Sequence, residues 1–543
     1  MKERYFNLTH TSFLVLAVIF FFPCCQNQSS FEISEQDRLL FESAQKNAVL
    51  ANEGFIRCEN FVNGWLEYCD PESGLIPRNI EESIDYWNAK DAAADNYPFM
   101  VLTSFFVDQE LFDGKMHEML QSEKSLTSRV RSLPDTYSFS KKGFLNDEIN
   151  MGQIIFGASE YIKDGLLPLT EFLGESPWSD RMIEMLYDLN EEIDIANEVM
   201  DKGFGSAAKE EVNGELLQVL SRIYWMTGDE KFLDWAIKIG DYYLLGNHHP
   251  TRDLDYLRLR DHGCELISGL CELYITTHFA KPDKKQSYQK PLHEMLDRIL
   301  EVGRNADGMF YDGINPQTGE IVQERIADTW GYTLNGYFGV FMVDEKPEYK
   351  EAILKLFSNL HKYKNHNWEG NADGYADAIE SALNLYNRIP DQNVADWIDS
   401  EIQVMWSMQR ESGIIEGWHG DGNFARTTIM HNLWKSKGVY AKPWRSDLFL
   451  GAEQKGDSLL ISIKSEEPWA GKLFFDKARY KENMKLPMDW PRINQFPEWV
   501  TVKKDGDYQL VDITDKVVKT HKGDELLQGI VLNVEGEKKL ILF

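Results

Sequence analysis

The sequence predicts a mainly α-helical fold, a closed (α/α)6-7 toroid of helical hairpins followed by a small antiparallel β domain. Three observations lead to this prediction. Helices that are apolar on every face alternate with amphipathic helices, each apolar helix begins with acidic or amide residues, and the last hundred or so residues alternate in polarity.

Residues 370–390 show the repeating unit best. They open with Asp373, Gly374 and Asp377, and the following helix is apolar on all sides, which is typical of a buried helix. Pro390 ends that helix, and an amphipathic helix follows to about Gln409. The unit is therefore an inner and an outer helix, with carboxylates at the start of the inner one.

The same kind of opening recurs along the chain, at residues 89–99, 145–153, 209–218, 259–269, 325–336, 371–380 and 420–430. Two-helix units at a spacing of about 45 to 65 residues cannot bury themselves singly, so they must stack or close into a ring. A closed ring brings all inner helix starts to one mouth, which explains the recurring polar openings. The clearest helix junction lies at residues 226–230, where Gly228 ends one helix and Asp229 begins the next.

From Trp444 onward the pattern changes to strands. Residues 447–476 alternate apolar and polar with glycine turns, and residues 525–543 predict two strands around a turn at Gly536. The loop at 491–499 is bracketed by prolines and has no role that its sequence reveals. We expect an N-terminal segment at 1–30, a toroid at 31–443 and a β domain at 444–543.

The N-terminus predicts export. Lys2 and Arg4 precede a ten-residue apolar run at 13–22, which is too short to span a bilayer and is typical of a secretory signal. Cys24 and Cys25 follow directly, as in a bacterial lipoprotein signal, so we expect a lipid anchor at one of them and a location in the periplasm or on the cell surface; simple secretion is the alternative. Of the other cysteines, Cys58 and Cys69 are spaced so that a disulfide is open to them, although packing explains all four.

Composition excludes one class of partner. The formal net charge is -31, from 88 acidic against 57 basic residues, whereas nucleic-acid binding needs a basic face. The 15 Trp, 23 Tyr and 30 Phe suit a large core and, where exposed, sugar rings. No phosphate loop, nucleophile elbow or metal-binding pair is present, and we expect no cofactor and no metal.

Paired carboxylates at the mouth suit glycosidic bond cleavage, which needs one group to protonate the leaving oxygen and another to act as nucleophile or base. Most acids at helix starts serve as caps, but three openings also carry Trp, His or Arg. The candidate catalytic residues are Asp91, Asp328, Glu324, His262 and Glu265. The candidate substrate-binding residues are Arg260, Arg325, Trp330, Tyr97, Asp95, Asp373, Trp87 and Arg426. The Arg residues suit the carboxylate of a uronic acid through bidentate pairing.

With its helical hairpins, acidic inner helix starts and β tail, the chain resembles the six-hairpin glycosidase-like superfamily over residues 35–440. Within it, the chain looks most like bacterial enzymes acting on uronic acids, the exo-acting β-glucuronidases and unsaturated glucuronyl hydrolases. The resemblance implies an exported glycoside hydrolase that takes part in polysaccharide degradation and acts on oligosaccharides or polysaccharides bearing uronic acid. It does not identify the catalytic pair residue by residue.

Two alternatives share these features. A polysaccharide lyase would use His262, Tyr97 or Tyr332 as base, with Asn96 or Arg260 neutralising the uronate. A lipid-anchored glycan-binding protein would need aromatic side chains at the mouth but no clustered acids with His and Arg. The sequence leaves open whether a hydrolase would retain or invert, because the separation of two carboxylates is a distance and not a spacing.

Overall fold

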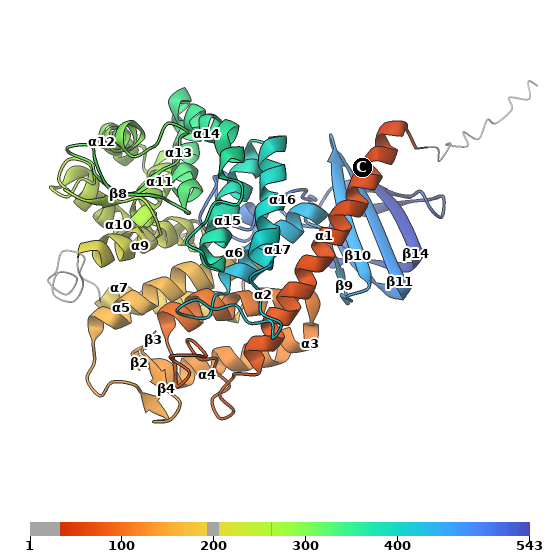
Figure 1. Ribbon diagram of the computed structural model, residues 1–543, viewed down its shortest axis with the longest axis horizontal. Coiled ribbons are helices and arrows are strands. Elements are labelled where there is room, and N and C mark those ends of the chain that lie inside the picture. The colour runs from red at the N-terminus through yellow and green to blue at the C-terminus, as the bar shows by residue number, and fades with distance from the viewer. Residues whose placement is uncertain (1–32, 193–205, 262) are drawn as a thin grey trace, which may run out of the picture.

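The computed structural model describes residues 33–192, 206–261 and 263–543. Helices form one body, an antiparallel sheet stands beside it, and the long first helix joins the two (Figure 1). In this part of the chain, no helix combines the length and apolar character needed to cross a membrane. Cys24 and Cys25 lie outside the described residues, so the lipid anchor stays a prediction.

The inner wall of the ring contains seven helical segments within the described chain. In order, these are η1 (Ala89–Asn96) with α2 (Tyr97–Val107), α5 (Met151–Glu160) with η3 (Tyr161–Leu166) and α6 (Leu167–Leu173), α9 (Ser206–Thr227), α11 (Gly263–Ala280), α13 (Trp330–Asp344), α15 (Ala372–Arg388) and α17 (Asn423–Ser436). Every predicted inner opening precedes or begins one of them. The predicted mainly α toroid followed by a β domain is confirmed.

Outer helices alternate with the inner ones along the chain. The main ones are α1 (Glu35–Leu66), α4 (His117–Thr127), α7 (Pro177–Glu192), α10 (Glu230–Gly240), α12 (Pro282–Val302), α14 (Pro347–Asn359) and α16 (Gln392–Trp406). Shorter segments extend three of them: α3 (Gln109–Leu111) and η2 (Phe112–Met116) precede α4, η4 (Asp241–Leu245) follows α10, and η5 (Leu360–Tyr363) follows α14. The predicted junction is confirmed, because α9 ends at Thr227, Gly228 has φ +73° and the Asp229 side chain caps α10.

Glycines let neighbouring inner helices approach closely. A Cβ on Gly269 of α11 would lie 2.5 Å from the carbonyl oxygen of Gly214 in α9. The ring closes in the same way: a Cβ on Gly422, just before α17, would overlap the backbone of Asp95 and Asn96 in η1. Because glycine leaves room at these points, the start of α17 lies directly against the end of η1, where α2 begins.

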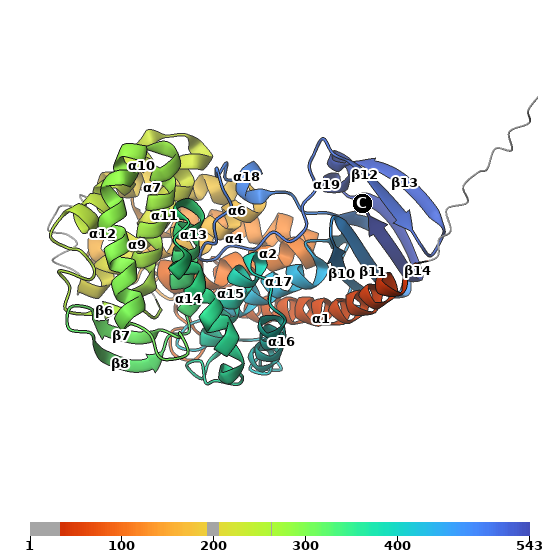
Figure 2. The ribbon, with the colours of Figure 1, turned by 90° about the horizontal axis from the view of Figure 1, so that it is seen from above.

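The C-terminal sheet has the strand order β10-β11-β14-β12-β13, and β9 (Tyr440–Lys442) pairs with β11. The strands are β10 (Leu448–Lys455), β11 (Ser458–Phe474), β12 (Asp507–Asp512), β13 (Val517–Lys522) and β14 (Ile530–Leu542), with the short helices α18 (Arg479–Glu482) and α19 (Gly523–Gln528) between them. Helix α1 runs from the ring to the sheet (Figure 2), where Asn47 and Asn52 donate hydrogen bonds to the carbonyl oxygens of Ala452 and Leu448 in β10.

Among smaller features, the expectation for the C-terminal strands differs from the structure, whereas the cysteines agree with the expectation that packing explains them. The prediction of two C-terminal strands was wrong: β14 is continuous, and Gly536, with φ +83°, lies where its partner β11 carries a bulge between Ser465 and Trp469. The cysteines at 58, 69, 264 and 271 are free thiols, three of them buried.

Three small sheets lie outside the main one. They are β1 (Tyr86–Trp87) with β4 (Tyr137–Ser138) and β5 (Gly143–Phe144), β2 (Ser128–Val130) with β3 (Leu133–Pro134), and β6 (Leu257–Arg258) with β7 (Tyr311–Asn315) and β8 (Glu320–Ile326). In the last of these, β7 and β8 form a hairpin between α12 and α13.

The proline-bracketed loop at 491–499 inserts into the helical ring. Arg492 is fully buried and pairs with Glu171 of α6 at 2.5 Å. Asn494 adopts a left-handed conformation with φ +60°, and its backbone N–H donates to Glu380 of α15 at 2.6 Å. The strand-rich C-terminal part of the chain therefore contributes a segment to the inside of the toroid.

We expect Arg492→Met to lower the free energy of unfolding by about 3 kcal/mol, because Glu171 would remain buried without its closest cation. Urea denaturation followed by tryptophan fluorescence measures this change. Arg445→Met is the matched control, since the Arg445–Asp447 pair is partly exposed and is expected to contribute less than about 1 kcal/mol. An equal loss in both variants would contradict the assignment.

Candidate active site

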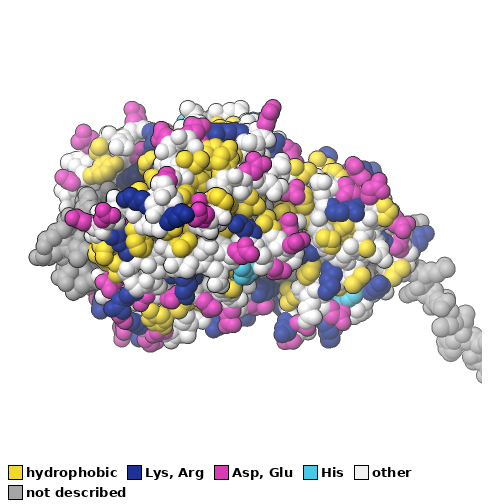
Figure 3. Space-filling view, turned by 90° about the horizontal axis from the view of Figure 1, so that it is seen from below, with side chains coloured by type: hydrophobic (Ala, Val, Ile, Leu, Met, Phe, Trp, Pro, Cys, Tyr) yellow, Lys and Arg dark blue, Asp and Glu magenta, His cyan; other side chains and the backbone are white. Residues whose placement is uncertain are grey.

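The first turns of the inner helices surround a cavity of about 400 Å³. Among the described residues, twelve carboxylates line it, against four Lys or Arg side chains and one histidine. On the face of the molecule shown in Figure 3, by contrast, acidic and basic side chains are interspersed. Such crowding in a poorly solvated space forces some of the carboxylates to hold a proton.

Two of these carboxylates come from the same helical segment. Asp91 and Asp95 are four residues apart on η1, which is a π-helix, and the Asn88 side chain caps it by accepting from the N–H of Ala92. The facing loop, residues 413–422, carries His419. The N–H of Gly420 donates to the carbonyl oxygen of Arg78 at 2.7 Å, which fixes this loop beside the segment that leads into η1.

Asp91 is held as a carboxylate. Its Oδ2 accepts hydrogen bonds from Arg78 Nε and Asn88 Nδ2, each at 2.6 Å. Burial by itself raises the pKa of Asp91, but the positive charges of His419, Lys90 and Arg78 outweigh it and bring the pKa below its ordinary value. Asp91 is therefore ionised throughout the neutral range.

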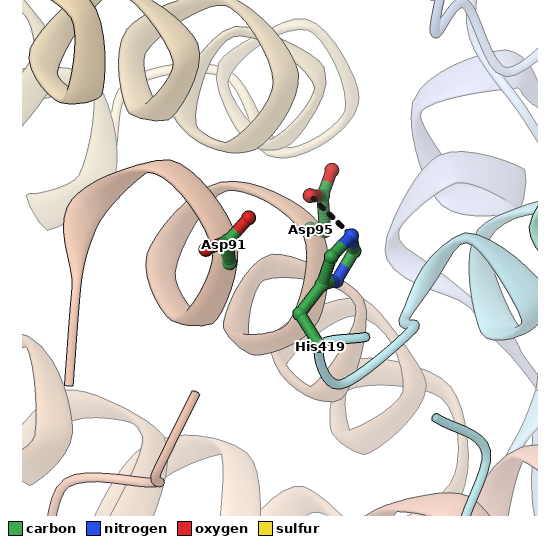
Figure 4. Close-up of side chains that lie close together, drawn as sticks. All are labelled: Asp91, Asp95 and His419. Atoms are coloured by element: carbon green, nitrogen blue, oxygen red, sulfur yellow. Dashed lines mark ion pairs between the residues drawn. The ribbon is translucent and has the colours of Figure 1, made fainter. Parts of the chain in front are cut away.

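Asp95, unlike Asp91, has a raised pKa. Burial raises its pKa to about 7, with the charges of Asp164 and Asp373 adding to the effect and His419 opposing it. Its Oδ2 lies 3.9 Å from His419 Nε2, while His419 Nδ1 is 2.9 Å from the carbonyl oxygen of Gly420 (Figure 4). Burial lowers the pKa of His419, but Asp95 and Asp91 raise it above its ordinary value. The arrangement keeps a proton available beside an ionised carboxylate.

Two further cavity acids hold protons near neutral pH. Burial raises the pKa of Asp328 to about 7, although Arg260 Nη1 lies 3.6 Å from its Oδ2. Burial raises the pKa of Asp421 to about 8, helped by the charge of Asp373. Asp421 is 3% exposed, and its Oδ1 accepts no hydrogen bond from the described residues.

The floor of the cavity is a buried polar network. Arg426 pairs with Asp377 at 2.7 Å and with Glu380 at 2.9 Å, and it donates to the Asn494 side chain. The Tyr332 hydroxyl donates to the same two carboxylates. Together with Ile493, Asn494 belongs to the loop at 491–499, so this loop closes the cavity from beneath.

The other cavity cations are also paired with protein carboxylates. Lys163 bonds to Asp164 at 2.7 Å and to Glu265 at 2.5 Å. Arg260 pairs with Asp312 at 3.0 Å and with Glu369. Lys90 has the most exposed side chain of the four, at 37%, and lies 3.9 Å from Asp91.

Two groups of side chains are close enough to share a cation. The nearest ligand atoms of Asp91, Asp95 and His419 lie within 4.8 Å of one another, as do those of Glu160, Asp164 and Glu215. In the first group, Asp91 already accepts from Arg78 and Asn88, and His419 bonds to the backbone. We interpret that group as acid–base machinery, because Asp91 Oδ2 already accepts from two protein donors and the positive charges of His419, Lys90 and Arg78 lower the pKa of Asp91.

The cavity brings together many of the candidates predicted from the sequence. The predicted residues that line it are Asp91, Asp95, Asp328, Asp373, Glu265, Arg260 and Arg426. They come from different inner helix starts, as a closed ring requires. His262 lies outside the described residues.

Five candidates need correction. Trp330, Tyr97 and Trp87 belong to the hydrophobic core and are at most 5% exposed, so they do not face a substrate. The Tyr97 hydroxyl donates to the carbonyl oxygen of Met116 and accepts from Trp178. Glu324 and Arg325 lie on strand β8, outside the cavity, because residues 311–326 form a hairpin and α13 begins only at Trp330.

The sequence-based selection also missed residues. Three cavity residues, Trp418, His419 and Asp421, lie in the glycine-rich loop before α17 and are not among the candidates predicted from the sequence. The signal was present, since this loop alternates glycine with Trp, His and Asp immediately before an inner helix. The hairpin was signalled by the turn residues at 315–319 between two alternating runs.

Comparisons with known proteins found similarity only at the level of structure. No family model matches the chain, and no curated protein matches it. An inactive variant of the α-1,6-mannanase GH76A of Salegentibacter sp. HEL1_6, in complex with α-1,6-mannotetrose, is similar with a TM-score of 0.39 and 9% identity, covering 70% of this chain and 97% of that one.

Two further solved structures are similar to a comparable degree. Unsaturated glucuronyl hydrolase from Bacillus sp. GL1 gives a TM-score of 0.38 at 11% identity, covering 53% of this chain and 86% of that one. Cellobiose 2-epimerase from Bacillus thermoamylovorans B4167 gives a TM-score of 0.36 at 12% identity, covering 58% of this chain and 88% of that one. At these values the likeness bears on no question of activity.

We expect Asp421→Asn to stabilise the protein more at pH 8 than at pH 5. Asp421 has a pKa of about 8 when folded against 3.8 ordinarily, so the unfolded chain releases this proton first and stability falls as pH rises between the two values. Asparagine does not ionise, so it removes this loss of stability. The stabilisation by Asp421→Asn should therefore be larger at pH 8 than at pH 5, by on the order of 1 kcal/mol or more. Thermal unfolding at both pH values measures it.

Glu535→Gln serves as the control for Asp421→Asn, because Glu535 is exposed on the C-terminal sheet. We expect its effect on the melting temperature to be the same at the two pH values. A pH-independent effect of Asp421→Asn would mean that its carboxyl group does not hold a proton in the folded protein.

Proposed function

We propose that the chain is a glycoside hydrolase in which Asp95 is the general acid and Asp91 the ionised partner. The observation that carries the proposal is the pair itself. Two carboxylates within 4.8 Å of each other line one cavity, and their surroundings move their pKa values in opposite directions. Such a division assigns the acid and base roles in carboxylate catalysis.

Each role follows from the local contacts. Asp95 holds its proton up to about pH 7, and its side chain accepts no hydrogen bond from the described residues, so the proton is free to pass to a leaving glycosidic oxygen. Asp91 is oriented by Arg78 and Asn88 and remains negative, which suits a nucleophile or a base. The positive charge of His419 stabilises Asp91 and also the carboxylate that Asp95 becomes after the transfer.

The distance favours a retaining reaction. Retaining enzymes place their carboxyl groups about 5–5.5 Å apart, while inverting enzymes leave about 6.5–9.5 Å for a water molecule. The separation of at most 4.8 Å between the nearest oxygens of Asp91 and Asp95 is closer to the first arrangement. Asp91 would then attack the anomeric carbon, and Asp95 would protonate the leaving oxygen and later deprotonate the incoming water.

We extend the proposal to glycans that end in a uronic acid, with Lys90 as the carboxylate-binding group. Arg260, Arg426 and Lys163 are within hydrogen-bond distance of protein carboxylates, which leaves Lys90 as the most exposed cation of the cavity. Lys90 also lies beside Trp418, whose ring is available to a sugar face. Export and a lipid anchor at Cys24 or Cys25 would place the enzyme where polysaccharides are met.

A lyase receives less support from the geometry. Of the predicted bases, Tyr97 is in the core, and the Tyr332 hydroxyl is committed to Asp377 and Glu380. Burial raises the pKa of Tyr332 well above its ordinary value, whereas a tyrosine base requires the reverse. A binding protein without activity would have no use for two adjacent carboxyl groups whose pKa values are shifted in opposite directions.

We expect Asp95→Asn to lower kcat about 10²–10⁴-fold while leaving KM within a few-fold, because general acid catalysis contributes about that much. In the unaltered protein kcat/KM should fall above about pH 7, where Asp95 loses its proton, and this alkaline limb should disappear in the variant. Released sugar measured against pH checks both. Glu324→Gln, on exposed β8, is the control and should keep full activity. Full activity in both variants would rule out the assignment.

The substrate class is tested by ultraviolet absorbance of the double bond conjugated to a uronate carboxylate. The protein is added to intact uronic-acid polysaccharides and to unsaturated oligosaccharides made by a lyase. Falling absorbance on the unsaturated ends, or free glucuronate without absorbance change, supports a hydrolase. Rising absorbance on intact chains contradicts it.

Lys90→Met should raise KM on a uronate-terminated substrate about tenfold, which corresponds to about 1.4 kcal/mol, and should not change KM for a neutral substrate.

A further inference from the structure

A second hollow adjoins the acidic cavity. It has a volume of about 670 Å³ and shares Lys90, Phe156 and Trp418 with the cavity. The two hollows therefore meet along these three side chains. We refer to the second one as the outer groove; its other lining residues lie between Arg78 and Gly157.

Trp418 stands at this boundary and is exceptionally exposed. Its side chain is 67% exposed, more than any other aromatic side chain in the described part of the chain. The guanidinium of Arg78 and the ammonium of Lys90 each lie 5.3 Å from its ring centroid. An exposed indole that bridges two hollows is typical of a binding surface, since a structural tryptophan would be covered.

The loop that carries Trp418 is fixed in place. Asn79 Nδ2 donates to the carbonyl oxygen of Gly417 at 3.1 Å, and the N–H of Ile80 donates to Glu416 at 2.9 Å. Together with the bond from Gly420 to Arg78, these contacts hold both sides of the loop. The next residue, His419, faces Asp95 (Figure 4). The loop therefore presents an acid–base group on one side and a platform for stacking on the other.

The chemistry of the outer groove differs from that of the cavity. Its lining includes the exposed amides Asn146, Asn150 and Gln153. Of the described residues that line it, only Asp135 is a carboxylate, and it is paired with Arg129 at 2.8 Å. Amides with an aromatic face suit a neutral, hydroxyl-rich ligand, because they donate and accept hydrogen bonds while the ring covers the apolar face of a sugar.

We propose that the outer groove binds the continuing units of a glycan chain whose terminal unit occupies the acidic cavity, with Trp418 stacking on the sugar next to the scissile bond. This inference rests on the proposed function, because it uses the cavity as the position of the terminal unit. It specifies the substrate further: the enzyme acts on the end of an oligosaccharide or polysaccharide and not on a simple monoglycoside. Lys90 lies at the junction, where it reaches either unit.

Binding is measured separately from catalysis, in the Asp95→Asn protein. Isothermal titration calorimetry compares ladders of cello-, xylo- and hyaluronan oligosaccharides, from disaccharide to hexasaccharide. For at least one ladder, affinity should rise about tenfold or more with the first added units and then level off as the groove is filled. Adding Trp418→Ala should abolish this dependence on length, and adding Gln153→Ala should weaken it. Phe279→Ala removes an exposed ring outside both hollows and should leave the dependence of affinity on chain length unchanged.

The same series distinguishes failure of the two proposals. If the protein with Asp95 intact hydrolyses glycans, but the affinity of the Asp95→Asn protein is independent of chain length for every ladder, the outer groove is not a subsite and the proposed function stands. If affinity depends on length and on Trp418 while no glycan is cleaved, the groove stands and the hydrolase proposal fails. If Trp418→Ala and Phe279→Ala changed the dependence of affinity on chain length equally, Trp418 would not be the stacking surface. In the active enzyme, Trp418→Ala should raise KM for the longer substrates and leave kcat within a few-fold.

Discussion

Repulsion among carboxylates at the mouth of the ring is the constraint on which the site depends. Closure of the toroid brings the polar starts of the inner helices together, and twelve acids share one cavity with four cations. They cannot all ionise in a poorly solvated space. Local partners decide which of them do: His419, Arg78 and Asn88 lower the pKa of Asp91, whereas burial and neighbouring acids raise the pKa of Asp95 and Asp421 in spite of His419. The cavity therefore contains protonated carboxyl groups next to a carboxylate that stays ionised.

Two segments that are not inner helices complete this arrangement. The loop at 413–422 brings His419 to Asp95 and Trp418 to the boundary with the outer groove. The loop at 491–499 closes the cavity from beneath through Asn494, which accepts from Arg426 and donates to Asp164. Glu171 and Arg492 anchor that loop in the core. The helices supply carboxylates, while these loops supply a charged imidazole, a stacking surface and a floor.

The candidate site was predictable to the extent that it depends on position in the repeat. Asp91, Asp95, Asp328 and Asp373 were identified because they stand at inner helix starts, and all four line the cavity. Trp87, Tyr97 and Trp330 stand near the same starts but face the core, because rotation about the helix axis decides which neighbour looks inward. Glu324 and Arg325 were misplaced because an inserted hairpin delays the start of α13. Neither effect is visible in local composition.

The sequence by itself determined the architecture, because burial on all faces and polar helix starts are local patterns that recur along the chain. It also determined that acids would gather at one mouth. Only the tertiary structure decided which acid keeps its proton, since the pKa of Asp95 depends on Asp164, Asp373 and His419, residues distant in the chain. It alone brought the 413–422 and 491–499 loops to the cavity, because the contacts that place them join segments hundreds of residues apart.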